Sequence, residues 1–311
     1  MGSFVGHALP GTFFILFGVW WTVRIFIRYF ESLTRRGEPY SSSVTYPPRL
    51  KRFPNVNLEA LMVTIGAGLG IFVEIVAACF MRGKPLGVTN EQHATMYFFF
   101  GLAGFVCLTI PFYRGALPAL DGDLQFITLL LAFAAESLLF KFHLIGRDGI
   151  DILVHTLLLY ACYACVLSTG LEMAYRTNML ASLARAFFTI VQGTWFWQTA
   201  FLLYSPFNGE AWGSKTGGHD HGGGGGKEGG MHGGGGGEHI DHQRYMTITL
   251  IFAWHVAVVF LLTLVTGALI GCRYRRQVDT HKVRLQTSFA SPPCNGYAVM
   301  QNGAADDDDE L

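Results

Sequence analysis

Seven apolar stretches, each close to 20 residues long, constrain the fold of this chain more than any other feature. A helix of about 20 residues spans the hydrocarbon core of a bilayer, where every backbone polar group must be satisfied within the protein. Hydrophobic residues make up 51% of the chain and charged residues only 14%, a balance typical of membrane proteins. We therefore predict an all-α membrane protein, a bundle of seven transmembrane helices at approximately residues 10–30, 57–81, 93–112, 124–142, 151–173, 182–204 and 246–270.

Two segments have a different composition. We expect residues 1–275 to form the transmembrane domain, with a flexible loop at 205–245, and residues 276–311 to form a disordered cytosolic tail with an acidic end. The loop is rich in glycine and cannot bury a core of its own. Its histidines and carboxylates could bind a metal ion such as Zn²⁺ or Cu²⁺ loosely, or the loop could be a low-complexity insertion without a ligand.

The distribution of basic residues predicts how the chain crosses the membrane. Lysine and arginine are enriched in the first loop, around 35–52, and after residue 272. Because basic loops remain in the cytoplasm, we predict a cytosolic C-terminus and an N-terminus outside the cell or in a lumen. The formal net charge is zero, so the lipid bilayer is the expected partner and nucleic acid is not.

Several polar residues lie inside the predicted spans. Within 182–204, Gln192, Trp195 and Gln198 cover an arc of roughly 120° on one helix. An amide in hydrocarbon needs a hydrogen-bond partner, so this arc should face other helices. We interpret it as one wall of an internal pocket.

Depth estimates add residues from other spans to this pocket. A rise of about 1.5 Å per residue puts five polar residues about 6 to 13 Å below the outer ends of their helices, namely Glu74, Glu136, His155, Gln198 and His255. His7, His93 and His143 fall near the outer surface itself. Ionisable groups inside a bilayer are costly and are usually functional. We predict one pocket with His93 and His143 at its mouth, lined by Glu74, Glu136, His155, Gln192, Trp195, Gln198 and His255.

This set of residue types leaves several functions open. Glu74, Glu136, His155 and His255 could bind a metal ion such as Zn²⁺, with Gln198 in the outer shell. A zinc-bound water with a carboxylate as general base would suit a lipid hydrolase, and the same acids and histidines could serve a proton or metal transporter. Alternatively, the residues form a structural hydrogen-bond network in a non-catalytic trafficking or scaffold protein.

Six short motifs together resemble the transmembrane protein 45 family. They are Gly6–Gly11, Gln92–Tyr97, Glu136–His143, His155–Tyr160, Gln192–Gln198 and Trp254–His255. The resemblance covers residues 1 to about 272 and implies a multi-pass protein of the endomembrane system, in the Golgi or on the post-Golgi route, or of the plasma membrane. It implies no established biochemical activity. The glycine- and histidine-rich loop departs from the family, so a metal role of that loop is not implied.

Overall fold

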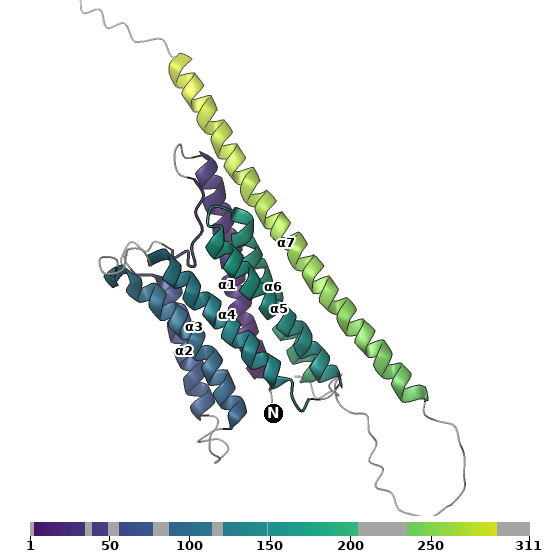
Figure 1. Ribbon diagram of the computed structural model, residues 1–311. Helices are drawn as coiled ribbons and strands as arrows, with labels where there is room; N and C mark the ends of the chain where they lie inside the picture. Colours follow the sequence, from purple (N-terminus) through teal and green to yellow (C-terminus); the bar gives the residue numbers. More distant parts are fainter. Residues whose placement is uncertain are drawn as a thin grey trace, which may run out of the picture. The chain divides into compact units, whose positions relative to one another are not determined.

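The computed structural model describes residues 3–34, 39–48, 56–76, 87–113, 121–147, 149–204 and 235–290. The regular structure within these ranges is entirely helical (Figure 1). The prediction of an all-α, multi-pass membrane bundle is confirmed. The helices are α1 (Phe4–Thr34), α2 (Leu58–Val76), α3 (Val88–Tyr113), α4 (Asp121–His143), α5 (Gly149–Ala174), α6 (Met179–Leu203) and α7 (Gly235–Ala290).

Helix α7 is longer than the predicted span at 246–270. It includes residues 235–245, predicted as loop, and residues 276–290, predicted as tail. No proline interrupts the chain after Gly235 until Pro292, and the residue before a proline disfavours helical geometry, so α7 ends at Ala290. The rest of the predicted loop and tail, 205–234 and 291–311, lies outside the described residues.

Six of these helices are long and apolar enough to cross a membrane, and α6 is the exception. Its length of 25 residues is sufficient, but Arg185, Gln192 and Gln198 lower its apolar character. Most of the polar side chains of α6 are buried inside the bundle. Its fully buried polar residues are spaced three, four, three and seven apart, so they follow one face of the helix: Ser182, Arg185, Thr189, Gln192 and Thr199.

The pairing of helices follows the chain order from α2 to α6. Each helix from α2 to α5 packs against the next helix in the chain. Helix α1 packs along α6 instead of along α2. Glycines allow this close contact: a Cβ atom on Gly11 would lie 2.8 Å from the carbonyl oxygen of Gly193, and one on Gly193 would lie 2.8 Å from that of Gly11. Small residues of this kind permit close packing of membrane helices.

Residues 39–48, between α1 and α2, extend into the bundle. The side chains of Tyr40, Val44 and Tyr46 are buried. The Ser42 amide donates to the carbonyl of Arg176 at 2.7 Å, so backbone groups of this non-helical segment are satisfied by the helices around it. The segment covers the side of the bundle where α2, α4 and α6 begin. We call the other side, where α1, α3 and α5 begin, the N-terminal side.

Candidate functional site

Four histidines from four different helices surround one small cavity on the N-terminal side. His7 of α1, His93 of α3, His143 of α4 and His155 of α5 line a cavity of about 50 Å³. The rings of His93 and His143 have centroids 5.8 Å apart, and those of His143 and His155 are separated by 6.2 Å. The structure thus brings His155, from the predicted pocket, together with the two histidines predicted at its mouth.

His7 and His155 meet directly. Their Nε2 atoms lie 3.3 Å apart. The Nδ1 atom of His7 lies 3.0 Å from the carbonyl oxygen of Ser3, and the Nδ1 atom of His155 lies 2.9 Å from that of Asp151. A carbonyl oxygen only accepts hydrogen bonds, so each Nδ1 must carry a proton and donate it. His155 is completely buried and His7 nearly so.

A carboxylate and a guanidinium border this pair. Asp151 Oδ1 lies 2.7 Å from His155 Nδ1, and Arg147 donates to both Asp151 oxygens at 2.8 and 2.9 Å. Arg147 also contacts His143 Nε2, while His143 Nδ1 lies 3.0 Å from Gln92 Oε1. Arg147 and Asp151 were not predicted. Their four-residue spacing to each other and on to His155 is the signal that could have identified them.

Glu74 and His93 form a separate pair at the edge of this cluster. Glu74 lies near the end of α2, and its Oε1 atom is 3.1 Å from His93 Nδ1. Its Oε2 atom accepts a hydrogen bond from Asn90 at 2.6 Å. This pair connects α2 with the start of α3, so Glu74 contacts one of the predicted mouth residues.

Glu136 and Gln192 interact deeper in the bundle. Gln192 Nε2 donates to Glu136 Oε1 at 2.8 Å, and Gln192 Oε1 accepts from the Cys165 thiol at 3.2 Å. Seven residues separate Glu136 from His143 on α4, which is about 10 Å along the axis. Phe140 and Phe196 lie between the two levels on α4 and α6, and both rings pack against the histidines. The Glu136 pair and the histidine cavity are therefore distinct.

The other predicted pocket residues lie on further faces of the bundle. Trp195 is fully buried and donates its indole N–H to the carbonyl of Val154 at 2.9 Å. The His255 ring of α7 packs on Trp195, with centroids 5.4 Å apart. Gln198 is half-buried and lines neither the histidine cavity nor the Glu136 pair. The nine predicted residues thus occupy several places.

The predicted zinc ligands are among the residues that this arrangement separates. Glu74, Glu136, His155 and His255 each contact different partners. Across the part of the chain that the structure describes, no three histidine, cysteine, aspartate or glutamate side chains converge on one point. Three such protein ligands are the usual minimum for a catalytic zinc. The geometry at the histidine cavity is that of hydrogen bonds among imidazoles, a carboxylate and a guanidinium.

A second polar site lies on the opposite side of the bundle and was not predicted. Arg185 of α6 and Glu172 of α5 are both fully buried and form an ion pair. Arg185 Nη2 also donates to the carbonyl of Ser43 at 3.1 Å, and the guanidinium lies 4.2 Å from the centroid of the Trp21 ring. The sequence signal was one arginine and one glutamate in two successive apolar helices, since a lone charge in hydrocarbon requires a partner.

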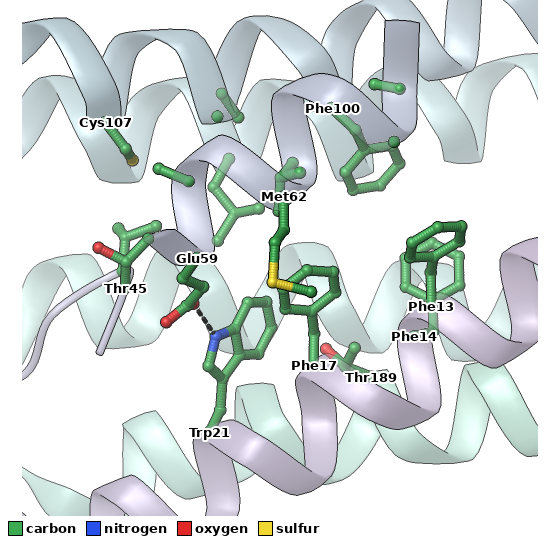
Figure 2. A pocket seen from close by; sticks show the side chains of 18 of the residues that line it. Phe13, Phe14, Phe17, Trp21, Thr45, Glu59, Met62, Phe100, Cys107 and Thr189 are labelled. Atoms are coloured by element: carbon green, nitrogen blue, oxygen red, sulfur yellow. Dashed lines mark hydrogen bonds between the residues drawn. The ribbon is translucent and has the colours of Figure 1, made fainter. Parts of the chain in front are cut away.

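Glu59 extends this second site to α1 and α2. It is buried in the first turn of α2 and accepts hydrogen bonds from the indole nitrogens of Trp20 and Trp21 and, at 2.7 Å, from the backbone amide of Tyr46. Burial raises the pKa of the Tyr46 hydroxyl, and of the Tyr40 hydroxyl nearby, so both remain neutral. Glu59 also lines an apolar cavity of about 120 Å³ (Figure 2).

The fold and these internal polar clusters define a multi-pass helical membrane protein. Residues 122–268 match a protein family described as a family of unknown function, DUF716. The chain is 24% identical over 276 residues to transmembrane epididymal protein 1A of Mus musculus, covering 83% of this chain and 77% of that protein. It is 22% identical over 279 residues to transmembrane epididymal protein 1 of Rattus norvegicus, with the same coverage.

Transmembrane epididymal protein 1 of Homo sapiens is a further relative, 25% identical over 152 residues, or 49% of this chain and 53% of that protein. These similarities extend over several helices of the bundle and agree with a multi-pass membrane protein. They support the broader part of the resemblance found in the sequence, and the narrower name of the transmembrane protein 45 family stays a prediction.

Proposed function

We propose that this protein is a proton-responsive, non-enzymatic membrane protein of the endomembrane system, and that the His7–His155 pair is its proton-binding site. A single observation carries the proposal. The line of atoms from the Ser3 carbonyl through both imidazoles to the Asp151 carbonyl contains three contacts at hydrogen-bond distance. Three hydrogen bonds need three protons, and two neutral imidazoles carry only two.

The missing proton belongs between the two Nε2 atoms. If both Nδ1 protons are donated to carbonyl oxygens, the facing Nε2 atoms present two lone pairs to each other at 3.3 Å. If either ring instead carried its proton on Nε2, its Nδ1 lone pair would face a carbonyl oxygen. A third proton removes the conflict, because one imidazolium Nε2–H then donates to the neutral neighbour.

The charged groups around the pair fit this role. Asp151 approaches His155 Nδ1 and compensates the positive charge. On the other elements, Arg147 and His143 oppose further protonation, the Tyr204 ring packs on His7 with centroids 5.2 Å apart, and His93 is balanced by Glu74. The cluster therefore suits one proton more than several.

The proposed orientation gives the site a biological setting. The basic first loop and C-terminal segment favour a cytosolic C-terminus, which puts the N-terminal side, and with it the histidine cavity, toward the lumen or the outside. Histidine is the side chain whose charge changes between about pH 5 and 8. A histidine pair facing the lumen would respond to acidification along the Golgi and post-Golgi route.

The other functions considered from the sequence have less support. A zinc-dependent lipid hydrolase would need a ligand set that the four predicted residues do not assemble, and a transporter would need a polar path across the membrane. The rings of Phe14, Phe100 and Phe133 pack together near the middle of the bundle and interrupt such a path. In a trafficking or scaffold protein whose polar residues are only structural, the histidine pair would share no proton, and the titration below tests this.

Nuclear magnetic resonance of ¹⁵N-histidine in the purified protein tests the proposal. We expect both Nδ1 nuclei of the pair to remain protonated, while the two Nε2 nuclei lose one shared proton together as the pH rises. His7→Asn should remove the shared step from His155. His255→Asn, on a ring that packs on Trp195, is the matched control and should leave it unchanged. Two Nε2 nuclei that titrate independently would contradict the proposal.

A metal ion between the two Nε2 atoms is the competing explanation of their distance. Elemental analysis of a variant lacking residues 205–234 separates a site in the bundle from the histidines of the loop. We expect no stoichiometric metal in this variant. Stoichiometric zinc that disappears in the His155→Asn variant would replace the proton by a metal ion.

A further inference from the structure

Independently of the proton site, we propose that the apolar cavity between α1, α2, α3 and α4 binds one acyl chain of a bilayer lipid. Figure 2 shows aromatic rings from two helices around this cavity, together with Met62 of α2. Phe13, Phe14 and Phe17 come from α1 and Phe100 comes from α3. Its volume is about 120 Å³, close to that of an apolar cavity of roughly 150 Å³ that stays dry and binds benzene.

The polar residues at the cavity have partners of their own. Glu59 accepts three N–H donors from two tryptophans and a backbone amide. Thr45 Oγ1 accepts a hydrogen bond from Asn57 at 2.8 Å, and Thr189 Oγ1 donates to the carbonyl of Arg185 at 2.8 Å. These groups offer little to a polar ligand, so the cavity favours a hydrocarbon.

The cavity is accessible from the lipid. Helices α1 and α2 are not among the closely packed pairs, and Met62, which lines the cavity, is 53% exposed. Small residues on α2 and α3 leave the internal space, because their side chains do not fill the gap to the phenylalanines of α1. They are Ala60, Gly66, Ala67, Ala103 and Gly104.

The extent of the cavity identifies its occupant. On α2 it runs from Glu59, in the first turn, to Ala67, near the middle of a helix of 19 residues, or about 12 Å along the axis. This approaches half of a hydrocarbon core of roughly 30 Å, the depth of one leaflet. A partner helix, with a diameter of about 10 Å or more, needs far more space than the 120 Å³ of this cavity. An acyl chain from the leaflet on the side where α2 begins lies at this depth and matches the apolar lining, and the cavity of about 120 Å³ accommodates a segment of it.

Photo-crosslinking in lipid vesicles tests this proposal on the full chain. The probe is phosphatidylcholine with a diazirine within one acyl chain, and labelled residues are mapped by mass spectrometry. Phe133 is the diagnostic residue, because it lines the cavity yet is only 1% exposed. Phe105, 53% exposed on α3, reports contact with bulk lipid. We expect label on both residues in the natural protein.

Two glycines on α2 provide a matched pair of variants. A Cβ atom on Gly66 would meet the Phe13 ring at 3.4 Å, whereas one on Gly68 would meet nothing within 4 Å. Gly66→Leu should fill the cavity and abolish the label on Phe133, while Gly68→Leu should preserve it. Both should retain the label on Phe105. Ala103→Leu fills the cavity from α3 and replaces Gly66→Leu if that variant fails to fold.

Three outcomes would overturn the proposal. They are an unlabelled Phe133 in the natural protein, equal labelling of Phe133 in the Gly66→Leu and Gly68→Leu variants, and stronger labelling of Phe133 by a photoreactive sterol or a photoreactive free fatty acid than by the phosphatidylcholine probe. The last result would assign the cavity to a different ligand.

Discussion

At the scale of single residues, the ion pair between Arg185 and Glu172 is the most demanding feature of the interior. Both side chains are fully buried, and the Arg185 Nη1 atom has no hydrogen-bond partner among the described residues. Removing one member of a buried pair leaves an uncompensated charge, which costs much more than replacing both members with apolar residues. Each charge therefore contributes mainly by keeping the other from being buried without a partner.

This asymmetry predicts the behaviour of two variants and their combination. Arg185→Met and Glu172→Leu should each destabilise the protein by about 3–5 kcal/mol, whereas the double variant should recover most of that loss. Unfolding in detergent, followed by circular dichroism, provides the comparison. Additive losses in the double variant would show that the two charges do not depend on each other.

Single residues also show what depth along a helix can predict from the sequence and what it cannot. The depth estimates put His155 inside the predicted pocket and His93 and His143 at its mouth, and in the structure these three residues line one cavity. Depth does not determine rotation about the helix axis, and Glu136 and His255 therefore contact other neighbours. Glu59 and Arg185 were missed because both lie outside the layer of polar residues that the depth estimates defined.

At the scale of elements, the contact between α1 and α6 is unusual because the two helices are far apart in the chain. Apolar stretches predicted that both helices exist, but not that they would pair, since their contact depends on glycines whose spacing alone does not identify a partner. Gly11 and Gly193 allow the two backbones to approach closely. The close contact with α1 keeps α6 inside the bundle, with its polar face buried.

A single methyl group should reveal the closeness of this contact. In Gly193→Ala the added carbon would lie 2.8 Å from a backbone carbonyl oxygen of α1, so we expect a loss of about 1–3 kcal/mol from overpacking. Gly170→Ala on α5 is the control, because its Cβ atom would meet only the Leu130 side chain at 4.0 Å, and alanine favours a helix over glycine. Thermal unfolding should separate the two. Equal stability would argue against close packing.

At the scale of the whole molecule, orientation in the membrane decides which compartment the histidine cavity faces. The chain contains no Asn-Xaa-Ser/Thr sequence, so engineered glycosylation acceptors report without background. We expect an acceptor placed within 205–234 to be modified in cells and one placed within 291–311 to remain unmodified. Mobility shifts that disappear on glycosidase treatment provide the measurement. Modification of the second acceptor alone would reverse the orientation and point the cavity toward the cytosol.

The polar character of α6 has a consequence for synthesis at the ribosome. An arginine at the centre of an isolated transmembrane helix costs about 2.5–3.5 kcal/mol, and α6 is the helix that falls short of the apolar character of the other six. Its counter-charge, Glu172, lies on the preceding helix and is made first, separated from α6 by the short turn at Tyr175–Asn178. Insertion of α6 into the lipid would then depend on Glu172 of α5 being close enough to pair with Arg185. The two helices would therefore leave the translocation machinery together, as one hairpin.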